Sequence, residues 1–177
     1  MLMGIDPSLT RTGVGFTDGG RLVHTEGITV SGADSLEKAS LICRRLGELQ
    51  AQHQASEILV ELPSNRDYGH GGGASGQAAY GFCAGMVFQY MWMTCPDKQV
   101  IPLYTDVWSG HSKAQRRLRV VRKYPTFEAL SDSGMDRSDA VAMCMMWEQK
   151  WSRDPKFIAR YIRSVQIQFA QGDSNHV

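Results

Sequence analysis

Residues 1–16 read MLMGIDPSLTRTGVGF, and they place one aspartate, Asp6, where an apolar strand ends. Leu2 and Ile5 suit a buried strand, and Pro7 terminates it because proline has no amide hydrogen for the ladder. Two interpretations of the carboxylate are open from this stretch alone. Asp6 either starts the turn before the proline or serves a site at the end of a core strand.

The composition is typical of a soluble globular domain. The 177 residues are 42% hydrophobic and 21% charged, and a chain of this length can bury a core without disulfides. No stretch reaches the roughly 18 apolar residues of a membrane span, and no signal peptide is visible at the start. We therefore predict one domain over 1–172, a disordered tail at 173–177 and no membrane association.

The cysteines are scattered, and no two of them form a CxxC pair. They are Cys43, Cys83, Cys95 and Cys144. This spacing argues against a zinc site and for reduced thiols in a cytoplasmic protein.

The charge is unevenly distributed. The formal net charge is +1, but the segment 113–123 carries six basic residues and no acidic one. Such a basic patch can bind a polyanion even when the whole chain is nearly neutral. The segment is predicted to be a helix whose apolar face consists of Ala114, Leu118 and Val121.

The order of the predicted elements indicates an α/β fold with a mixed sheet. We expect strands at 2–6, 12–17, 21–30, 57–61 and 98–104, helices at 35–53, 74–93, 113–123 and 136–150, and an amphipathic stripe at 155–169. Asp18-Gly19-Gly20 is a hairpin turn signal, and Asp34 with Glu37 resembles a capping box. A hairpin followed by alternating strands and helices gives a mixed sheet.

Small residues share one face of the helix predicted at 74–93. Ala74, Ala78, Gly81 and Gly85 follow one another at helical spacing, so another backbone can come close to this face. Each interior glycine costs about 1 kcal/mol relative to alanine, which indicates a packing reason. Packing on the protein's own sheet and contact with a second subunit are both open.

Carboxylates end two of the predicted core strands and begin a predicted helix. LMGID ends in Asp6 and ILVE in Glu61, while Asp136 and Asp139 share one face of the helix start. Each has an ordinary explanation, such as a helix-dipole acid or an exposed strand end. If the two strands are neighbours, however, their ends lie about 5 Å apart.

Four carboxylates in one small space repel one another unless a cation joins them. Oxygen ligands alone suit Mg²⁺ or Mn²⁺. Two such ions about 3.5–4 Å apart are the arrangement that supports phosphodiester cleavage. The acids therefore indicate a metal-dependent nuclease.

Four segments together resemble the RuvC family of Holliday-junction resolvases in the RNase H-like superfamily, with phage-type members among the candidates. They are GIDPSLTRTGVGF, ILVELPSNRDYG, HSKAQ and MDRSDAVAM, in the family's order between residues 1 and 150. Each motif is short. The two strand-end acids and the D-x-x-D-A helix start are fairly specific in combination.

The resemblance implies an RNase H-like fold, with a five-stranded mixed sheet flanked by helices. It implies a Mg²⁺-dependent endonuclease that resolves four-way junctions by paired symmetric nicks, in the cytoplasm of a bacterial cell or a phage-infected host. The implied ligands of two Mg²⁺ ions, which Mn²⁺ can replace, are Asp6, Glu61, Asp136 and Asp139. Lys113 would act at the scissile phosphate. The family is homodimeric, and helix 74–92 has the position of its dimer helix.

The resemblance also suggests contacts to four-way junction or branched DNA. The predicted DNA-binding residues are Arg66, Tyr68, Lys113, Arg116 and Arg117, whereas Arg119 and Arg122 can be solvated. The chain departs from the family at Ser8, where many members have glycine, and at Trp108, near the place of a second family lysine. These departures concern junction selectivity more than the metal chemistry.

Other functions remain open for this sequence. The same fold could cut branched DNA in general or RNA–DNA hybrids. An actin-like kinase or ATPase would need a glycine at Ser8 and usually a second domain. A non-catalytic junction-binding protein would not need four acids, and the GHGGG loop lacks the Gly-Lys-Ser/Thr of a phosphate cradle.

Overall fold

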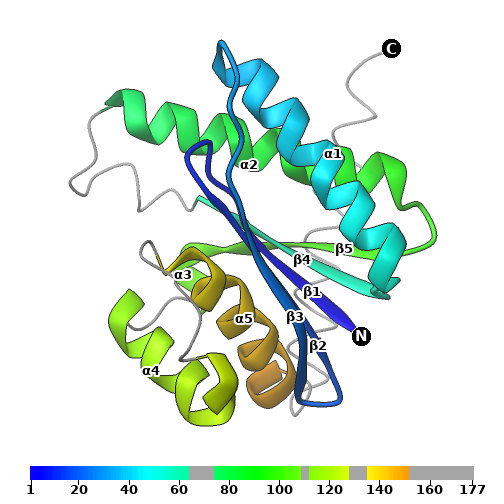
Figure 1. Cartoon of the computed structure of the whole chain (residues 1–177), viewed down its shortest axis with the longest axis vertical. Coiled ribbons are helices and arrows are strands. Elements are labelled where there is room, and N and C mark those ends of the chain that lie inside the picture. Colours follow the sequence, from blue (N-terminus) through cyan, green and yellow to red (C-terminus); the bar gives the residue numbers. More distant parts are fainter. Residues whose placement is uncertain (64–73, 109–111, 128–134, 152–177) are drawn as a thin grey trace. The chain divides into compact units, whose positions relative to one another are not determined.

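The computed structural model describes residues 1–63, 74–108, 112–127 and 135–151 (Figure 1). Residues 1–145 form one compact unit, and residues 146–177 form a second. The predicted stripe at 155–169 and tail at 173–177 lie outside the described residues. The single domain over 1–172 stays a prediction.

The first unit is built on a five-stranded mixed sheet with the order β3-β2-β1-β4-β5. Its strands are β1 Leu2–Asp6, β2 Thr12–Asp18, β3 Arg21–Ile28, β4 Glu57–Leu62 and β5 Gln99–Tyr104. The first three are antiparallel neighbours, while β4 runs parallel to both β1 and β5. The predicted α/β fold with a five-stranded mixed sheet is confirmed.

The turn between β2 and β3 has the geometry that its glycines predict. Gly19 and Gly20 have φ values of 53° and 78°, which glycine adopts without steric cost. A two-residue turn with positive φ at both positions matches the twist of the flanking strands. The hairpin is therefore encoded locally.

All the helices predicted within the described residues are present. The helices are α1 Ser35–His53, α2 Ala74–Thr94, α3 Thr105–Trp108, α4 Lys113–Lys123 and α5 Asp136–Met146, with a 3-10 turn at Pro125–Phe127 and a π-helix at Trp147–Trp151. The four-residue α3 was not predicted, because it is too short to show periodicity. The predicted helix 136–150 instead changes to π-helix after Met146. None of the described helices is long and apolar enough to span a membrane.

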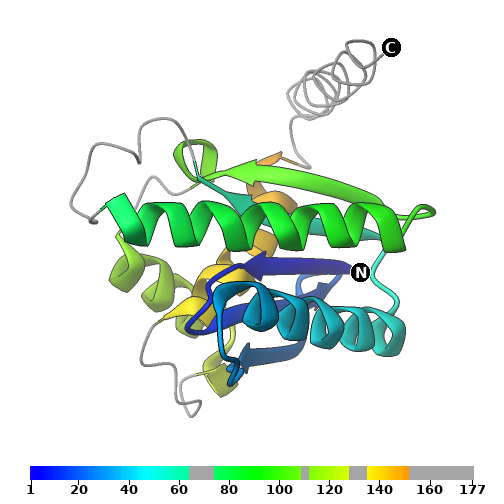
Figure 2. The same cartoon turned by 90° about the horizontal axis from the view of Figure 1, so that it is seen from above.

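Helices α1 and α2 cover one face of the sheet (Figure 2). Met3 and Ile5 of β1 and Val60 of β4 are fully buried in the core that these helices complete. Because side chains alternate along a strand, Gly4 and Asp6 point to the opposite face. That opposite face carries α5.

Three glycines let α5 lie directly on the sheet. A Cβ added to Gly4 would overlap the carbonyl oxygen of Ala140, and one added to Gly13 would overlap that of Asp136. At Gly15 it would meet the side chain of Val141. Sheet and helix backbones are therefore in contact, which fixes how close the start of α5 lies to the end of β1.

Side-chain caps set the start of α1 and α4. Asp34 accepts a hydrogen bond from the Glu37 amide at 2.8 Å, as predicted, but the Glu37 carboxylate accepts from Ala33 instead of Asp34. Ser112 and Gln115 form a complete capping box on α4. The sequence of these residues, S-x-x-Q, is a capping-box signature.

The predicted orientation of α4 is wrong. Leu118 is 57% exposed and Ala114 is also exposed, while Val120 is fully buried. The side chain of Arg116 is only 11% exposed. Part of the basic side of the helix faces inward, because Arg116 pairs with the buried carboxylate of Asp139.

Candidate active site

The register of β1 and β4 brings Asp6 and Glu61 together. Ile5 pairs with Val60, so the two acids occupy the next position on neighbouring parallel strands. Both side chains alternate onto the face that carries α5, and their exposed fractions are 6% and 7%. The proximity of the two carboxyl groups affects the pKa of each.

The start of α5 adds two more carboxylates above this pair. Met135, just before the helix, has a φ of 59°, an uncommon value for a non-glycine residue. Its carbonyl accepts hydrogen bonds from the Asp139 amide at 2.9 Å and from the Ser138 hydroxyl at 2.8 Å. Asp139 is 1% exposed, and Asp136 lies one turn earlier on the same face.

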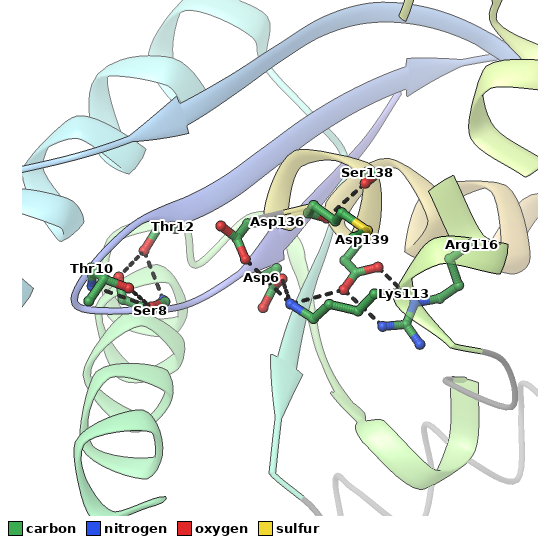
Figure 3. Close-up of polar contacts among 10 residues, drawn as sticks. Asp6, Ser8, Thr10, Thr12, Lys113, Arg116, Asp136, Ser138 and Asp139 are labelled. Carbon is green, nitrogen blue, oxygen red and sulfur yellow. Dashed lines mark hydrogen bonds and ion pairs between the residues drawn. The ribbon is translucent and has the colours of Figure 1, made fainter. Parts of the chain in front are cut away.

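The ammonium group of Lys113 lies among these acids (Figure 3). Its Nζ is 3.3 Å from Asp139 Oδ2, 3.4 Å from Asp136 Oδ1 and 3.7 Å from Asp6 Oδ2. Residues from β1, α4 and α5, far apart in sequence, thus meet around a single cation.

Arg116 holds Asp139 from the other side. Its Nε donates to Asp139 Oδ1 at 2.7 Å and its Nη2 to Oδ2 at 2.8 Å (Figure 3). The guanidinium also lies 4.8 Å from the ring centroid of Trp108, which is 2% exposed. A bidentate arginine–carboxylate pair is a strong and geometrically specific interaction.

The local environment raises the pKa values of the two strand-end acids, Asp6 and Glu61. Burial raises the pKa of Asp6 to about 7, although the Lys113 ammonium acts to lower it. Burial and the neighbouring charge of Asp6 raise the pKa of Glu61 well above its ordinary value. Desolvation acts to lower the pKa of Lys113, but the surrounding carboxylates outweigh it and raise that pKa. Four carboxyl groups therefore share this pocket with two cationic side chains, those of Lys113 and Arg116.

The residues of the pocket fit a hard divalent cation by donor type. All the acidic donors are carboxylate oxygens, which Mg²⁺ and Mn²⁺ prefer. Asp6 Oδ2 is buried and has no hydrogen-bond partner, and its nearest cationic atom is the Nζ of Lys113. In the described part of the chain, no three His, Cys, Asp or Glu side chains are arranged as a metal cage. Lys113 and Arg116 hold the carboxylates instead.

The remaining residues that were predicted to bind DNA lie on α4 or outside the described residues. Arg117 has its guanidinium 5.7 Å from the ring centroid of Phe127. Arg66 and Tyr68 lie outside the described residues. Sequence reasoning assigned Arg116 to DNA and missed its pairing with Asp139. The DNA-binding roles of all these residues stay predictions.

Solved structures of junction resolvases share this fold. RuvC of Thermus thermophilus in complex with a Holliday junction substrate matches with a TM-score of 0.61 at 20% identity, over 80% of this chain and 87% of that one. A second T. thermophilus RuvC structure matches with a TM-score of 0.58 at 23% identity, over 80% of this chain and 89% of that one. The yeast mitochondrial Holliday junction resolvase matches with a TM-score of 0.61 at 10% identity, over 93% of this chain and 85% of that one.

These likenesses define the fold class as RNase H-like. More particularly, the chain has the fold of the RuvC-type junction resolvases, as the sequence motifs implied. No family model matches the chain, and no curated protein sequence does.

The buried acids are expected to make stability depend on pH. Between the ordinary pKa of 3.8 and the folded value of about 7, folded Asp6 binds a proton that the unfolded chain has lost. The raised pKa therefore has no effect on stability at low pH, where the carboxyl is neutral in both states. As pH rises through this window, it lowers the free energy of unfolding by at most about 1.4 kcal/mol per pH unit.

The Asp6→Asn variant lacks this cost. The free energy of unfolding of the variant and of the parent can be measured with urea in EDTA. The difference in favour of the variant is expected to grow from pH 4 to pH 7 and then level off. A difference that is constant over this range would contradict the burial of a raised-pKa carboxyl.

Proposed function

We propose that the protein is a Mg²⁺-dependent endonuclease that resolves four-way DNA junctions by paired symmetric nicks. The observation that carries the proposal is the meeting of three carboxylates within 3.3–3.7 Å of one ammonium nitrogen, at the end of β1. This pocket lies in a fold that the chain shares with junction resolvases.

The chain offers ligands for two Mg²⁺ ions, or for Mn²⁺ in their place. The residues that would hold them are Asp6, Glu61, Asp136 and Asp139. When bound, such ions supply an activated water and a counter-charge for the departing 3′-oxygen. Arg116 keeps Asp139 in a fixed orientation, and Lys113 brings a half-exposed positive charge to the pocket where a scissile phosphate would lie.

The basic surface of α4 supports binding of a polyanion beside this pocket. Arg119 and Arg122 are exposed on the helix, and Arg117 is partly exposed. Cations along such a surface bind phosphates through a salt-dependent release of counterions. This arrangement favours four-way junction or branched DNA as the partner.

The direct experiment is cleavage of a synthetic mobile four-way junction, with Mg²⁺ or with EDTA. We expect paired nicks at symmetric positions in Mg²⁺ or Mn²⁺ and none in EDTA. Equal cleavage of flaps or RNA–DNA hybrids would instead indicate a broader nuclease of the same fold. Binding without cleavage under every metal condition would contradict the proposal and favour a non-catalytic junction-binding protein.

The exposed face of α2 supports a homodimer. Ala78, Phe82, Gly85, Gln89 and Trp92 are exposed and follow one another at spacings of four and three residues. Phe82 is 40% and Trp92 45% exposed, and a Cβ added to Gly85 would meet no atom within 4 Å. Aromatic side chains beside a small residue suit contact with a second helix. A two-fold dimer would present two pockets to the two strands cut at a junction.

Phe82→Asp is expected to convert the dimer to a monomer, because it buries a charge at the centre of this face. Analytical ultracentrifugation at micromolar concentration measures the change. Leu118→Asp is the matched control, since Leu118 is 57% exposed but lies on α4, and this variant is expected to stay dimeric. A monomeric parent, or a Phe82→Asp protein with the parent's mass, would contradict an α2 interface.

A further inference from the structure

We propose that Lys113 is the internal counter-ion of the metal-free pocket, and that it must be displaced when a divalent cation binds. The inference rests on the proposed function, because it assumes that the pocket takes such a cation. It assigns Lys113 a role in metal affinity that is separate from any contact with DNA.

The position of the ammonium is the first argument. Its Nζ lies 3.3–3.7 Å from oxygens of Asp6, Asp136 and Asp139. Those oxygens come from the end of β1 and the first turn of α5, so they surround a single location. A divalent ion held by the same oxygens would need that location, which an ammonium cannot share with it.

The charge of the pocket is the second argument. Asp6, Glu61 and Asp139 are buried, and buried like charges are costly unless a cation accompanies them. Arg116 binds both oxygens of Asp139, whereas the ion pairs of Asp6 and Asp136 are made with Lys113. Lys113 therefore neutralises the part of the pocket that the arginine does not reach.

The two cations of the pocket differ in exposure and in the length of their ion pairs. The Arg116 side chain is 11% exposed, pairs at 2.7 and 2.8 Å, and packs on Trp108. The Lys113 side chain is 49% exposed, its ion-pair distances are longer, and it stands at the first residue of α4. A lysine carries a compact charge on a flexible stem, so it can leave the pocket while the arginine stays.

Displacement would also deliver the charge to a useful place. Lys113 remains attached at the start of α4, so a displaced ammonium stays at the mouth of the pocket. There it can face an incoming phosphate. The same side chain would thus stabilise the acids before metal binds and the substrate afterwards.

The test is Mn²⁺ binding to the full-length, DNA-free protein, measured by isothermal titration calorimetry. Lys113→Met keeps the length of the side chain and removes its charge. We expect it to bind Mn²⁺ more tightly than the parent, on the order of tenfold, because the competing cation is gone. In EDTA its melting temperature is expected to fall, and Mn²⁺ is expected to restore it.

Arg119→Met is the matched control. It removes one positive charge from the exposed face of the same helix, about 9 Å further along its axis. We expect its Mn²⁺ affinity and its melting temperature in EDTA to be close to those of the parent. An equal gain in affinity for both variants would show a general charge effect and overturn the inference.

The outcomes separate this inference from the proposed function. If Asp6→Asn loses the Mn²⁺ binding of the parent but Lys113→Met binds as the parent does, the pocket holds metal and Lys113 is not its counter-ion. If neither the parent nor Lys113→Met binds Mn²⁺, the metal site itself is refuted and both proposals fall. Tighter binding and slower cleavage by Lys113→Met would support both.

Discussion

Asp6→Asn is expected to slow junction cleavage on the order of a thousandfold or more, with little change in affinity for the uncut junction. The substitution replaces a carboxylate that is buried at the centre of the pocket and whose Oδ2 has no hydrogen-bond partner. An amide of the same shape keeps the packing but cannot supply the charge that a divalent cation needs. Glu61→Gln is expected to behave in the same way.

Single-turnover kinetics with excess protein measure the rate, and binding of junction in EDTA measures the affinity. Asp97→Asn is the control, because Asp97 is 71% exposed and pairs with Lys98, away from the pocket. Its rate is expected to match the parent. Cleavage by Asp6→Asn at the parent's rate would refute the assignment of the site.

Gly13→Ala is expected to destabilise the protein by about 1–3 kcal/mol or more and to slow cleavage. Gly13 is the cross-strand partner of Asp6, and a Cβ there would overlap the backbone of Asp136. The start of α5 would have to move away from β1, and the Asp136 and Asp139 carboxylates would move with it. One methyl group would thus act on stability and on the site together.

Urea unfolding and single-turnover cleavage measure the two effects. Gly76→Ala is the matched control, since a Cβ at Gly76 in α2 would meet no atom within 4 Å. That change is expected to leave cleavage unaltered and to stabilise the helix slightly. If Gly13→Ala were as stable and as active as the parent, the close contact of α5 with the sheet would not be what positions the acids.

Local sequence signals predicted much of this fold. The two glycines after Asp18 specified the hairpin, and Asp34 capped α1. Strand β1 ended where expected, and β4 ended one residue later than expected. Each of these features depends on residues within one turn or one strand. The convergence of the strand-end acids also followed, because neighbouring parallel strands bring corresponding ends together.

Features that depend on distant partners were not predictable in the same way. The pattern of α4 indicated an inward Leu118, but the ion pair between Arg116 and Asp139, 23 residues apart, turns the arginine inward instead. Nothing in the local periodicity of α4 encodes that carboxylate. Gly4, Gly13 and Gly15 can be read from the sequence. Only the structure identifies α5 as the helix whose backbone lies against them.

We propose that the acids of β1, β4 and α5 form one pocket that binds divalent cations. Crystals of the protein soaked in Mn²⁺ test it by anomalous diffraction. We expect strong peaks between Asp6, Glu61, Asp136 and Asp139, with the Lys113 ammonium moved out of the position that it holds among them. Crystals that bind Mn²⁺ elsewhere but show no anomalous density among these four carboxylates would contradict the account.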